Sequence, residues 1–341
     1  NSIRHGGQNP KSKIFLVSPD PQKIHGFEHA WENLKIITNQ KTAYLEAAKK
    51  RGVDITFLRL PRIKNTANLL REEKVRALIP RGGKLLVFKN LPRLEKIATQ
   101  NGWQVLMPSA QFTQLLEDKI NFVAFCRKNK LPILPTRITA LNAVEFKQPI
   151  VVQQRMGHAG ETTFFVRSEA ELQKLQKRIG EYVVKITPLV KLPTFSLNLC
   201  VTRKQIFLTQ PFYQITGDKR LNPNEGGTGG IDLGLAQEML SKKTRVKIFT
   251  LAERVGKCLR KLGYRGIAGL DLLVDDASGK IYFVECNPRL LANLGFLTRL
   301  QTKAGETPLL TLHLCEHIGL AIDKKIPQIS AVKSGRQEVK H

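Results

Sequence analysis

The sequence predicts an α/β layer domain followed by an α+β unit that is rich in antiparallel strands. In the first part of the chain, short apolar runs alternate with helical stretches, which is typical of an α/β layer. From Ile150 onward, short strand-like runs follow one another closely, as they do in an antiparallel sheet. Pro132 and Pro135 interrupt the chain between these regions, so they mark a boundary or a hinge.

The first part is expected to alternate strands and helices. Apolar runs predict strands at residues 14–17, 53–58, 84–88 and 104–107. A helix is expected at residues 42–51, where Gly52 suits the stop, and another from Pro92 to Gly102. A longer helical pattern covers residues 110–131 and ends at Pro132.

The second part is expected to consist mainly of strands. They are predicted at residues 150–154, 162–166, 182–186, 195–201 and 205–209, with a helix at 169–179. Residues 222–230, NPNEGGTGG, have the composition of a flexible loop. A later helix is expected to end at Gly263, and its buried face is predicted to consist of Ile248, Ala252, Val255, Leu259 and Leu262. From Ile326 we expect a basic tail with little to bury.

The net charge of +27 attracts polyanions such as nucleic acid, nucleotides, anionic membrane surfaces or acidic substrates. It does not choose among them. The basic clusters are spread along the chain without interleaved aromatic residues, so a lysine-rich solvated surface is favoured over a nucleic-acid-binding module. An acidic substrate, such as a glutamyl chain, is compatible with this charge.

The cysteines and the hydropathy indicate a reduced, non-membrane protein. The five cysteines lie far apart without a C-x-x-C pair, which favours buried thiols over a disulfide framework or a zinc site. His313 and His317 have i, i+4 spacing but lack a third ligand, so we interpret them as structural. No apolar run reaches the length of about 18 residues that a membrane span needs, and we expect a cytoplasmic protein.

A predicted hairpin brings three polar side chains to one face. The segment GIAGLDLLVDDASGKIYFVECNPRL contains two apolar strands joined by the turn-forming residues 275–279. Folding about this turn pairs residues whose numbers sum to 555 or 556, one register or its neighbour. Glu285 and Asn287 share a face because side chains alternate along a strand, and the pairing adds Asp271 to that face.

These three residues predict a metal site. Facing carboxylates destabilise a strand pair unless a cation lies between them. Asp271, Glu285 and Asn287 supply the hard oxygen ligands that suit magnesium, which usually takes further oxygens from substrate phosphates. The alternative is that Arg265 or Arg289 neutralises the carboxylates in an ion network, but the third oxygen ligand favours the metal.

The spacing of this motif resembles that of a known family. Asp271, thirteen intervening residues and then Glu285-Cys286-Asn287-Pro288-Arg289 are similar to the metal motif of the ATP-grasp superfamily, in the E-x-N-P-R form of biotin carboxylase and carbamoyl-phosphate synthetase. The resemblance implies a pre-ATP-grasp α/β domain at residues 1–111 and a two-lobed ATP-grasp domain with antiparallel sheets at 112–325. Its lid would span about 135–187, and a basic tail would occupy 326–341.

The resemblance also implies ATP and Mg²⁺ as cofactors, with Mn²⁺ as an alternative metal. Lys119, in LEDKINFVAF, inherits the role of the lysine that reaches the ATP phosphates. Gly157 and Gly160 correspond to the small-residue loop whose amides approach the phosphates, although an ordinary hairpin turn explains G-x-x-G equally well.

The chain departs from the family at two positions. Gln153 stands where the family has its second phosphate lysine, and Arg155 or His158 is the candidate for the missing charge. Lys185 stands where the hinge that holds adenine usually has an acidic residue. Only backbone contacts around Ile186 and Thr187 are therefore carried over from the family.

By this resemblance, Arg289 faces the carboxylate or acyl-phosphate end of the substrate, and Arg289 and Lys119 are the catalytic candidates. The implied activity is an ATP-dependent ligase that joins a small-molecule or peptide carboxylate to an amine through an acyl-phosphate. The alternative is a scaffold with impaired turnover that binds nucleotide and uses its basic surface for polyanions. Many relatives are dimers, so a homodimer is a further expectation.

Overall fold

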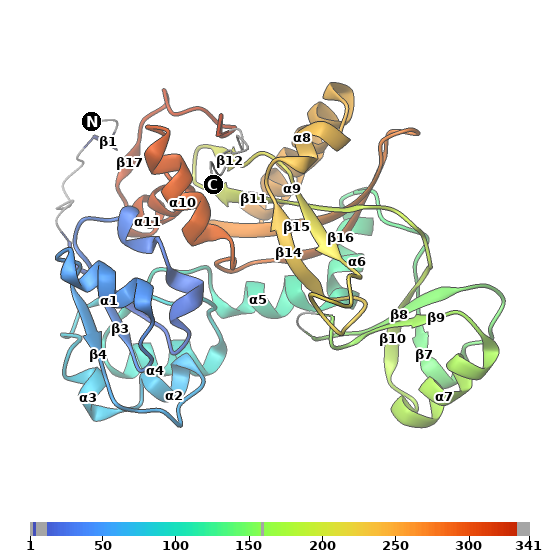
Figure 1. Ribbon diagram of the computed structural model, residues 1–341, viewed down its shortest axis with the longest axis horizontal. Coiled ribbons are helices and arrows are strands. Elements are labelled where there is room, and N and C mark those ends of the chain that lie inside the picture. The colour runs from blue at the N-terminus through green and yellow to red at the C-terminus, as the bar shows by residue number, and fades with distance from the viewer. Residues whose placement is uncertain (1–2, 5–11, 158–159, 333–341) are drawn as a thin grey trace.

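The computed structural model describes residues 3–4, 12–157 and 160–332. Figure 1 shows the N-terminal α/β domain at lower left, a small lid at lower right and a larger sheet above and between them. Helix α5 (Ala110–Glu117) runs from the N-terminal domain toward the other two parts. Among the helices that the structure describes, none combines the length and the apolar character needed to cross a lipid bilayer.

The N-terminal domain is built on a parallel sheet in the order β4-β3-β2-β5-β6. The strands are β2 (Ile14–Val17), β3 (Leu34–Thr38), β4 (Ile55–Phe57), β5 (Lys84–Leu86) and β6 (Gln104–Val105). The four predicted strands are confirmed, β2 with the predicted bounds and the other three with shorter ones. The fifth, β3, was not predicted because Lys35 interrupts its apolar run; in the structure this lysine reaches Asp54 at the next strand.

Helices cover this sheet. The hydroxyl of Thr42 caps α1 (Ala43–Lys50), and α4 (Pro92–Gln100) begins with a proline in its first turn, as predicted. Four shorter elements were not predicted: α2 (Thr66–Leu69), α3 (Glu73–Arg76) and the 3₁₀ turns η1 (Pro21–Ile24) and η2 (Phe27–His29). Each has only three or four residues, too few to produce a periodic pattern.

The prediction of one helix over residues 110–131 is wrong at Asp118. This residue has extended backbone angles, and its carboxylate accepts hydrogen bonds from the amides of Ile120 at 2.9 Å and Asn121 at 3.1 Å. The chain therefore ends α5 at Glu117 and starts α6 (Lys119–Lys128) with Asp118 as the N-cap. The break places Lys119 at the first position of a new helix.

The lid is a four-stranded antiparallel sheet in the order β7-β10-β8-β9, with α7 (Glu169–Ile179) against it. Its strands are β7 (Arg137–Ala140), β8 (Ile150–Gln154), β9 (Thr163–Val166) and β10 (Val183–Pro188). The predicted strands at 150–154, 162–166 and 182–186 and the helix are confirmed, and β7 is an additional edge strand. The lid has its own small apolar core.

The central sheet is antiparallel, in the order β14-β13-β11-β15-β16, with β12 also paired to β11. Its strands are β11 (Thr194–Val201), β12 (Ile206–Leu208), β13 (Phe212–Thr216), β14 (Thr228–Asp232), β15 (Gly266–Asp275) and β16 (Lys280–Asn287). The expectation of a loop over all of 222–230 is wrong for its last three residues. They join β14 because β13, which was not predicted, supplies a pairing partner.

Two helices pack on the central sheet, α8 (Leu235–Met239) and α9 (Lys242–Lys261). Ile248, Ala252, Val255 and Leu259 are buried, as predicted. Leu262 is not part of this face: it is the C-cap of α9 and is 47% exposed. The helix ends there because Gly263 adopts a positive φ of 88°.

The C-terminal helices α10 (Leu294–Lys303) and α11 (Leu309–Ile318) join the apolar core of the N-terminal domain. Strand β17 (Ala321–Ile322) pairs with β1 (Ile3–Arg4). In the described part of the expected tail, residues 327–332 are exposed or half-buried, which fits a segment that buries little. Ile326 is buried, and Leu208 exchanges backbone hydrogen bonds with Gln328 and Ser330. Residues 333–341 of the predicted tail lie outside the described residues.

We propose that the chain consists of three parts, residues 1–111, 112–325 and 326–341. The shared core of the N-terminal domain and the C-terminal helices means that the first two parts pack as neighbours with a continuous apolar interior. Gly26 and Gly295 make this contact close, since a Cβ at Gly295 would lie 1.7 Å from the carbonyl oxygen of His25.

Candidate functional site

A cavity of about 950 Å³ lies where the lid, the central sheet and the carboxyl edge of the parallel sheet meet. The predicted residues that line it are Lys119, Gln153, Gly157, Gly160, Lys185, Thr187, Asp271, Glu285, Asn287 and Arg289. Arg155 and Ile186 are not among the lining residues. The tertiary structure therefore gathers most of the predicted positions, from strands of both lobes, around one space.

Asp271 and Glu285 are directly opposite each other in the β15–β16 hairpin. The pairing follows one predicted register from Gly269 to Asp271 and the other from Leu272 onward, with a β-bulge between. Asn287 lies one step along the same face. Its Nδ2 donates to Asp271 Oδ2 at 3.2 Å and to Glu285 Oε1 at 2.9 Å.

The two facing carboxyl groups have pKa values that are shifted in opposite directions. Burial and the neighbouring charge of Glu285 raise the pKa of Asp271 to about 7, although Ser196 and Arg289 oppose this. Burial also disfavours ionised Glu285, but the positive charges of Lys119 and Arg289 and the amide of Asn287 outweigh it, so the pKa of Glu285 lies below its ordinary value. The pair therefore carries an electrostatic conflict that a bound cation would relieve.

The chemistry of these side chains fits magnesium. Within the residues that the structure describes, no cluster of three or more histidine, cysteine or acidic side chains could hold a metal ion. The candidate site has two carboxylates and one amide instead, and both carboxylates lie within hydrogen-bond distance of the Asn287 amide nitrogen. Turning the Asn287 amide would present its oxygen in place of its nitrogen, and three oxygen ligands suit a magnesium ion that keeps water or phosphate as its other ligands.

Lys119 lies beside the carboxylates, as the first residue of α6. Its Nζ is 3.7 Å from Glu285 Oε2 and donates to the carbonyl oxygen of Gly157 at 3.5 Å. The side chain is buried, and the backbone amide of Lys119 donates to Arg155 O, which ties the helix start to the end of β8. The ammonium of Lys119 therefore lies between the β15–β16 hairpin and the glycine loop, the segment that contains Gly157 and Gly160.

Arg289 is held by a buried acid. Its Nε donates to Glu117 Oε1 at 3.1 Å and its Nη2 donates to Asn287 Oδ1 at 3.0 Å. Glu117 also pairs with Lys89, which follows the parallel strand β5. Arg289 therefore does not neutralise Asp271 by contact, and Arg265, the other candidate, lies near Glu316 at 3.6 Å.

The glycine loop packs against a second loop. A Cβ at Gly160, where φ is 79°, would lie 2.4 Å from the backbone of Gly226, so both a positive φ and close approach require glycine there. Arg167 of the lid also pairs with Glu225. The segment before β14 and the lid loop therefore meet at the mouth of the cavity.

The positions around Gln153 are arranged differently from the expectation. Arg155 pairs with Asp118 through Nε at 2.8 Å and Nη2 at 2.7 Å, so its charge is engaged away from the cavity. His158 lies outside the described residues. Gln153 donates to Thr163 Oγ1 at 3.2 Å and lies opposite Lys185 in the β8–β10 pair.

The backbone contacts to a ligand that were expected around Ile186 and Thr187 of β10 are open at only one of these two residues. Ile186 is paired on both sides, with Arg137 of β7 and Val152 of β8, and its side chain belongs to the lid core. Among the described strands, only β8 pairs with Thr187, which lines the cavity. The free backbone edge therefore begins at Thr187 and not at Ile186.

Several cavity residues were not predicted. Ser196 donates to Asp271 Oδ1, and Gln214 Nε2 donates to the same oxygen at 2.7 Å. Asn198 donates to Asn293 Oδ1 at 3.2 Å. A sequence signal existed for two of them, because Ser196 and Asn198 alternate with apolar residues in TFSLNLCV, as Glu285 and Asn287 do in the hairpin.

The histidines and cysteines predicted to be structural lie away from this cavity. His313 is buried; its Nδ1 accepts from the amide of Ile267 at 3.1 Å and its Nε2 lies 2.8 Å from Leu106 O. Burial lowers its pKa to about 4. The five cysteines are unpaired, and all except Cys258 are buried.

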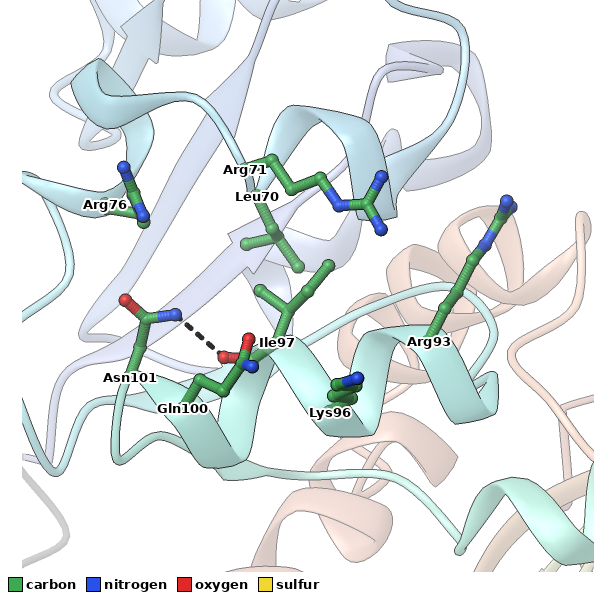
Figure 2. Close-up of a pocket in the computed structure, with 8 residues that line it drawn as sticks. All are labelled: Leu70, Arg71, Arg76, Arg93, Lys96, Ile97, Gln100 and Asn101. Atoms are coloured by element: carbon green, nitrogen blue, oxygen red, sulfur yellow. Dashed lines mark hydrogen bonds between the residues drawn. The ribbon is translucent and has the colours of Figure 1, made fainter.

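A second, smaller cavity of about 300 Å³ lies on the N-terminal domain between the α2–α3 region and α4 (Figure 2). Leu70 and Ile97 line its floor, and Asn101 Nδ2 donates to Ile97 O at 2.8 Å. The remaining lining residues are Arg71, Arg76, Arg93, Lys96 and Gln100. No acidic side chain is among the described residues that line it, so we call it the basic depression.

A parallel-sheet domain, an antiparallel lid and an antiparallel sheet whose hairpin turns two carboxylates toward a shared cavity define a two-lobed ATP-grasp fold. The chain belongs to the ATP-grasp family: the family model of the ATP-grasp domain matches residues 116–293, more than half of the chain. This match confirms the resemblance inferred from the sequence, and the mixed α/β and α+β architecture agrees with it.

Solved structures show the same fold at low sequence identity. An N5-carboxyaminoimidazole ribonucleotide synthetase in complex with ADP is 15% identical, with a TM-score of 0.65, and the match covers 92% of this chain and 78% of that one. Biotin carboxylase from Campylobacter jejuni is 15% identical (TM-score 0.62; 91% and 72% covered). Phosphoribosylamine–glycine ligase from Thermotoga maritima is 16% identical (TM-score 0.62; 90% and 75% covered). No curated protein matches the chain by sequence.

Proposed function

We propose that this protein is an ATP- and magnesium-dependent ligase that joins a carboxylate to an amine through an acyl-phosphate. The observation that carries the proposal is the group of Asp271, Glu285 and Asn287 on one face of the hairpin, with Lys119 at 3.7 Å from Glu285. Oxygen ligands for magnesium beside a buried lysine suit a polyphosphate. The names of the solved relatives, which include a carboxylase and an amine ligase, are consistent with this class.

The two ends of the cavity differ in chemistry, as the base and the phosphates of a nucleotide do. Leu189 and Leu192, which follow β10, line the cavity with apolar side chains, whereas Asp271 and Glu285 line it from the β15–β16 hairpin. A planar base would bury apolar area at the first end, and the phosphates would meet charge at the second. We propose that base recognition uses the backbone from Thr187 onward.

The substrate side of the cavity is proposed to lie at the parallel sheet. The sheet reverses its order between β2 and β5, and ligands of open parallel sheets bind beyond the carboxyl ends of the strands at such a point. Lys23 follows β2 and Phe88 follows β5, and both line the cavity. Lys23 Nζ and the Arg289 guanidinium lie 5.3 Å and 5.5 Å from the Phe88 ring centre. Two cations beside this ring favour an acidic substrate.

The proposed reaction needs positioning and charge neutralisation more than acid–base chemistry. Magnesium, when bound by Asp271, Glu285 and Asn287, would neutralise phosphate charge and orient the phosphates. Lys119 would hold the phosphates, and Arg289, fixed by Glu117, would align the substrate carboxylate. A carboxylate oxygen attacks the γ-phosphorus and ADP leaves; the amine then attacks the acyl carbon, phosphate leaves and a proton passes to solvent.

A screen with a surrogate amine tests this proposal. Purified protein is incubated with ATP, magnesium, hydroxylamine and single carboxylic acids, and acyl-hydroxamate and ADP are measured. We expect acid-dependent ADP release that is lost in Glu285→Gln and in Asn287→Ala. Undiminished turnover in both variants would contradict the assignment of the metal ligands.

The basic depression favours a second candidate function, the binding of a nucleic acid by a protein with impaired turnover. Its four cations lack acidic neighbours within the lining, and the chain has a net charge of +27. Fluorescence anisotropy with a single-stranded oligonucleotide tests it across a salt series. This candidate function requires an affinity for the oligonucleotide that falls as salt rises, and that is weaker in Arg71→Gln/Arg93→Gln but unchanged in Glu285→Gln. The absence of salt-dependent binding would exclude this function.

A further inference from the structure

Gln153 and Lys185 are cross-strand partners in the lid sheet, and both side chains line the large cavity. Opposite residues of an antiparallel pair project from the same face, with their Cβ atoms about 5 Å apart. A charge that is missing at one of the two positions can therefore be supplied from the other. Gln153 is neutral and donates to Thr163, whereas Lys185 is a cation.

Lys185 is buried without an acidic partner in contact. The residue is 5% exposed, and its Nζ donates to the carbonyl oxygen of Val284 at 3.2 Å. No ion pair joins it to a carboxylate in the part of the chain that the structure describes. An ammonium has three donors, and burying it in this state costs free energy that an incoming anion would offset.

The surroundings of Lys185 include the other charges of the site. Burial lowers the pKa of Lys185 to about 8, the negative charge of Glu285 raises it and the positive charge of Lys119 lowers it further. Lys185 lines the same cavity as Lys119 and the hairpin carboxylates, and Val284, which accepts its hydrogen bond, is the residue before Glu285. Its hydrogen bond to Val284 crosses from the lid to β16, so the ammonium lies where the two lobes meet.

We propose that the Lys185 ammonium binds the phosphate chain of the nucleotide, so that the second cation of the phosphate site comes from β10 and not from the β8 position that Gln153 occupies. This inference rests on the proposed nucleotide site. It assigns the side chain of Lys185 to phosphate and leaves base recognition to the backbone from Thr187 onward. If Lys185 only joined the lobes through Val284, its loss would change stability but not phosphate affinity.

Isothermal titration with ADP and with adenosine, in magnesium at pH 7, separates these roles. The variants are Lys185→Met, Gln153→Lys and the double variant; Lys177→Met, an exposed lysine of the lid helix, is the matched control. We expect Lys185→Met to weaken ADP binding by about tenfold to a hundredfold and to leave adenosine binding unchanged, because one charge-assisted contact to phosphate is lost. The double variant should recover most of the ADP affinity.

Three results would overturn the inference: an equal loss for adenosine and ADP, an unchanged ADP affinity, or no recovery in the double variant. Urea unfolding of each variant verifies folding, and Lys185→Gln replaces Lys185→Met if the latter does not fold. If the wild-type protein binds ADP and Lys185→Met binds it equally well, only this inference is contradicted. A wild-type protein that binds no nucleotide contradicts the proposed function, and the inference falls with it.

Discussion

Asp271 and Glu285 face each other at the last paired position before the bulge of the β15–β16 hairpin, and the amide of Asn287 donates to both. The bulge lets the rest of the hairpin continue in the neighbouring register while these side chains stay on the cavity face. Two carboxylates in such a pair are unfavourable without a cation.

Glu285→Gln should abolish the magnesium dependence of ATP binding and lower turnover at least about a hundredfold, because a metal ion contributes several kcal/mol of charge stabilisation. Titration of ATP with and without magnesium, together with ADP release, measures both effects. Glu253→Gln, at an exposed ion pair on α9, is the control and should behave as wild type. Retained magnesium dependence in Glu285→Gln would argue against the ligand set.

Glu117→Gln should lower turnover more than tenfold while the affinity for ADP changes little. Glu117 is buried between Lys89 and Arg289, and a neutral amide would leave two cations facing each other. We expect a loss of roughly 1–3 kcal/mol of stability as well. Steady-state kinetics, ADP titration and urea unfolding measure these effects, with Glu181→Gln on the lid as the control. A Glu117→Gln protein with normal turnover would show that Arg289 does not need this anchor.

Gly295→Ala should destabilise the protein, although alanine favours a helix over glycine by about 1 kcal/mol. The added Cβ would meet His25 O at 1.7 Å, where the N-terminal domain contacts α10, and backbone cannot move aside cheaply. Urea unfolding should show a lower midpoint than wild type. Lys303→Ala, in the exposed last turn of α10, should leave the midpoint nearly unchanged. A higher midpoint for Gly295→Ala would contradict the tight docking of this helix.

His313 should make the protein less stable as pH falls from about 6.5 to about 4, because it is neutral when folded, whereas the raised pKa of Asp271 acts in the opposite direction in this window. Burial lowers the folded-state pKa of His313 from 6.5 to about 4, so in this window the unfolded state binds more protons at this residue and is favoured. This difference corresponds to about 3 kcal/mol at the lower end. His317, whose pKa is also lowered by burial, acts in the same direction.

Urea unfolding at pH 7 and pH 4.5 measures this effect. The free energy of unfolding at pH 4.5 minus that at pH 7 should be more positive in His313→Gln, whose amide can both donate and accept a hydrogen bond, than in wild type. An equal difference in the two proteins would show that His313 does not contribute to the pH dependence.

Local sequence patterns were sufficient for most of the framework. The strands at 14–17 and 150–154, the helix at 169–179 and the hairpin with its carboxylates were predicted because each has an unambiguous period, turn or cap within a few residues. The E-x-N-P-R spacing was sufficient for the family. Among the elements that were missed, β3, β7 and β13 are short strands whose stability comes from partners elsewhere in the chain.

The hairpin side chains that share a face could be predicted from the sequence alone, because alternation along a strand is a local property. Which charges meet at that face could not, because it depends on contacts between distant parts of the chain. Arg155 pairs with Asp118 at the start of α6, Arg289 pairs with Glu117 of α5, and Lys185, opposite Gln153, donates to Val284. These contacts depend on how the lid, α5, α6 and the central sheet pack together. Long side chains can reach several partners, so their contacts follow from three-dimensional neighbours and not from spacing along the chain.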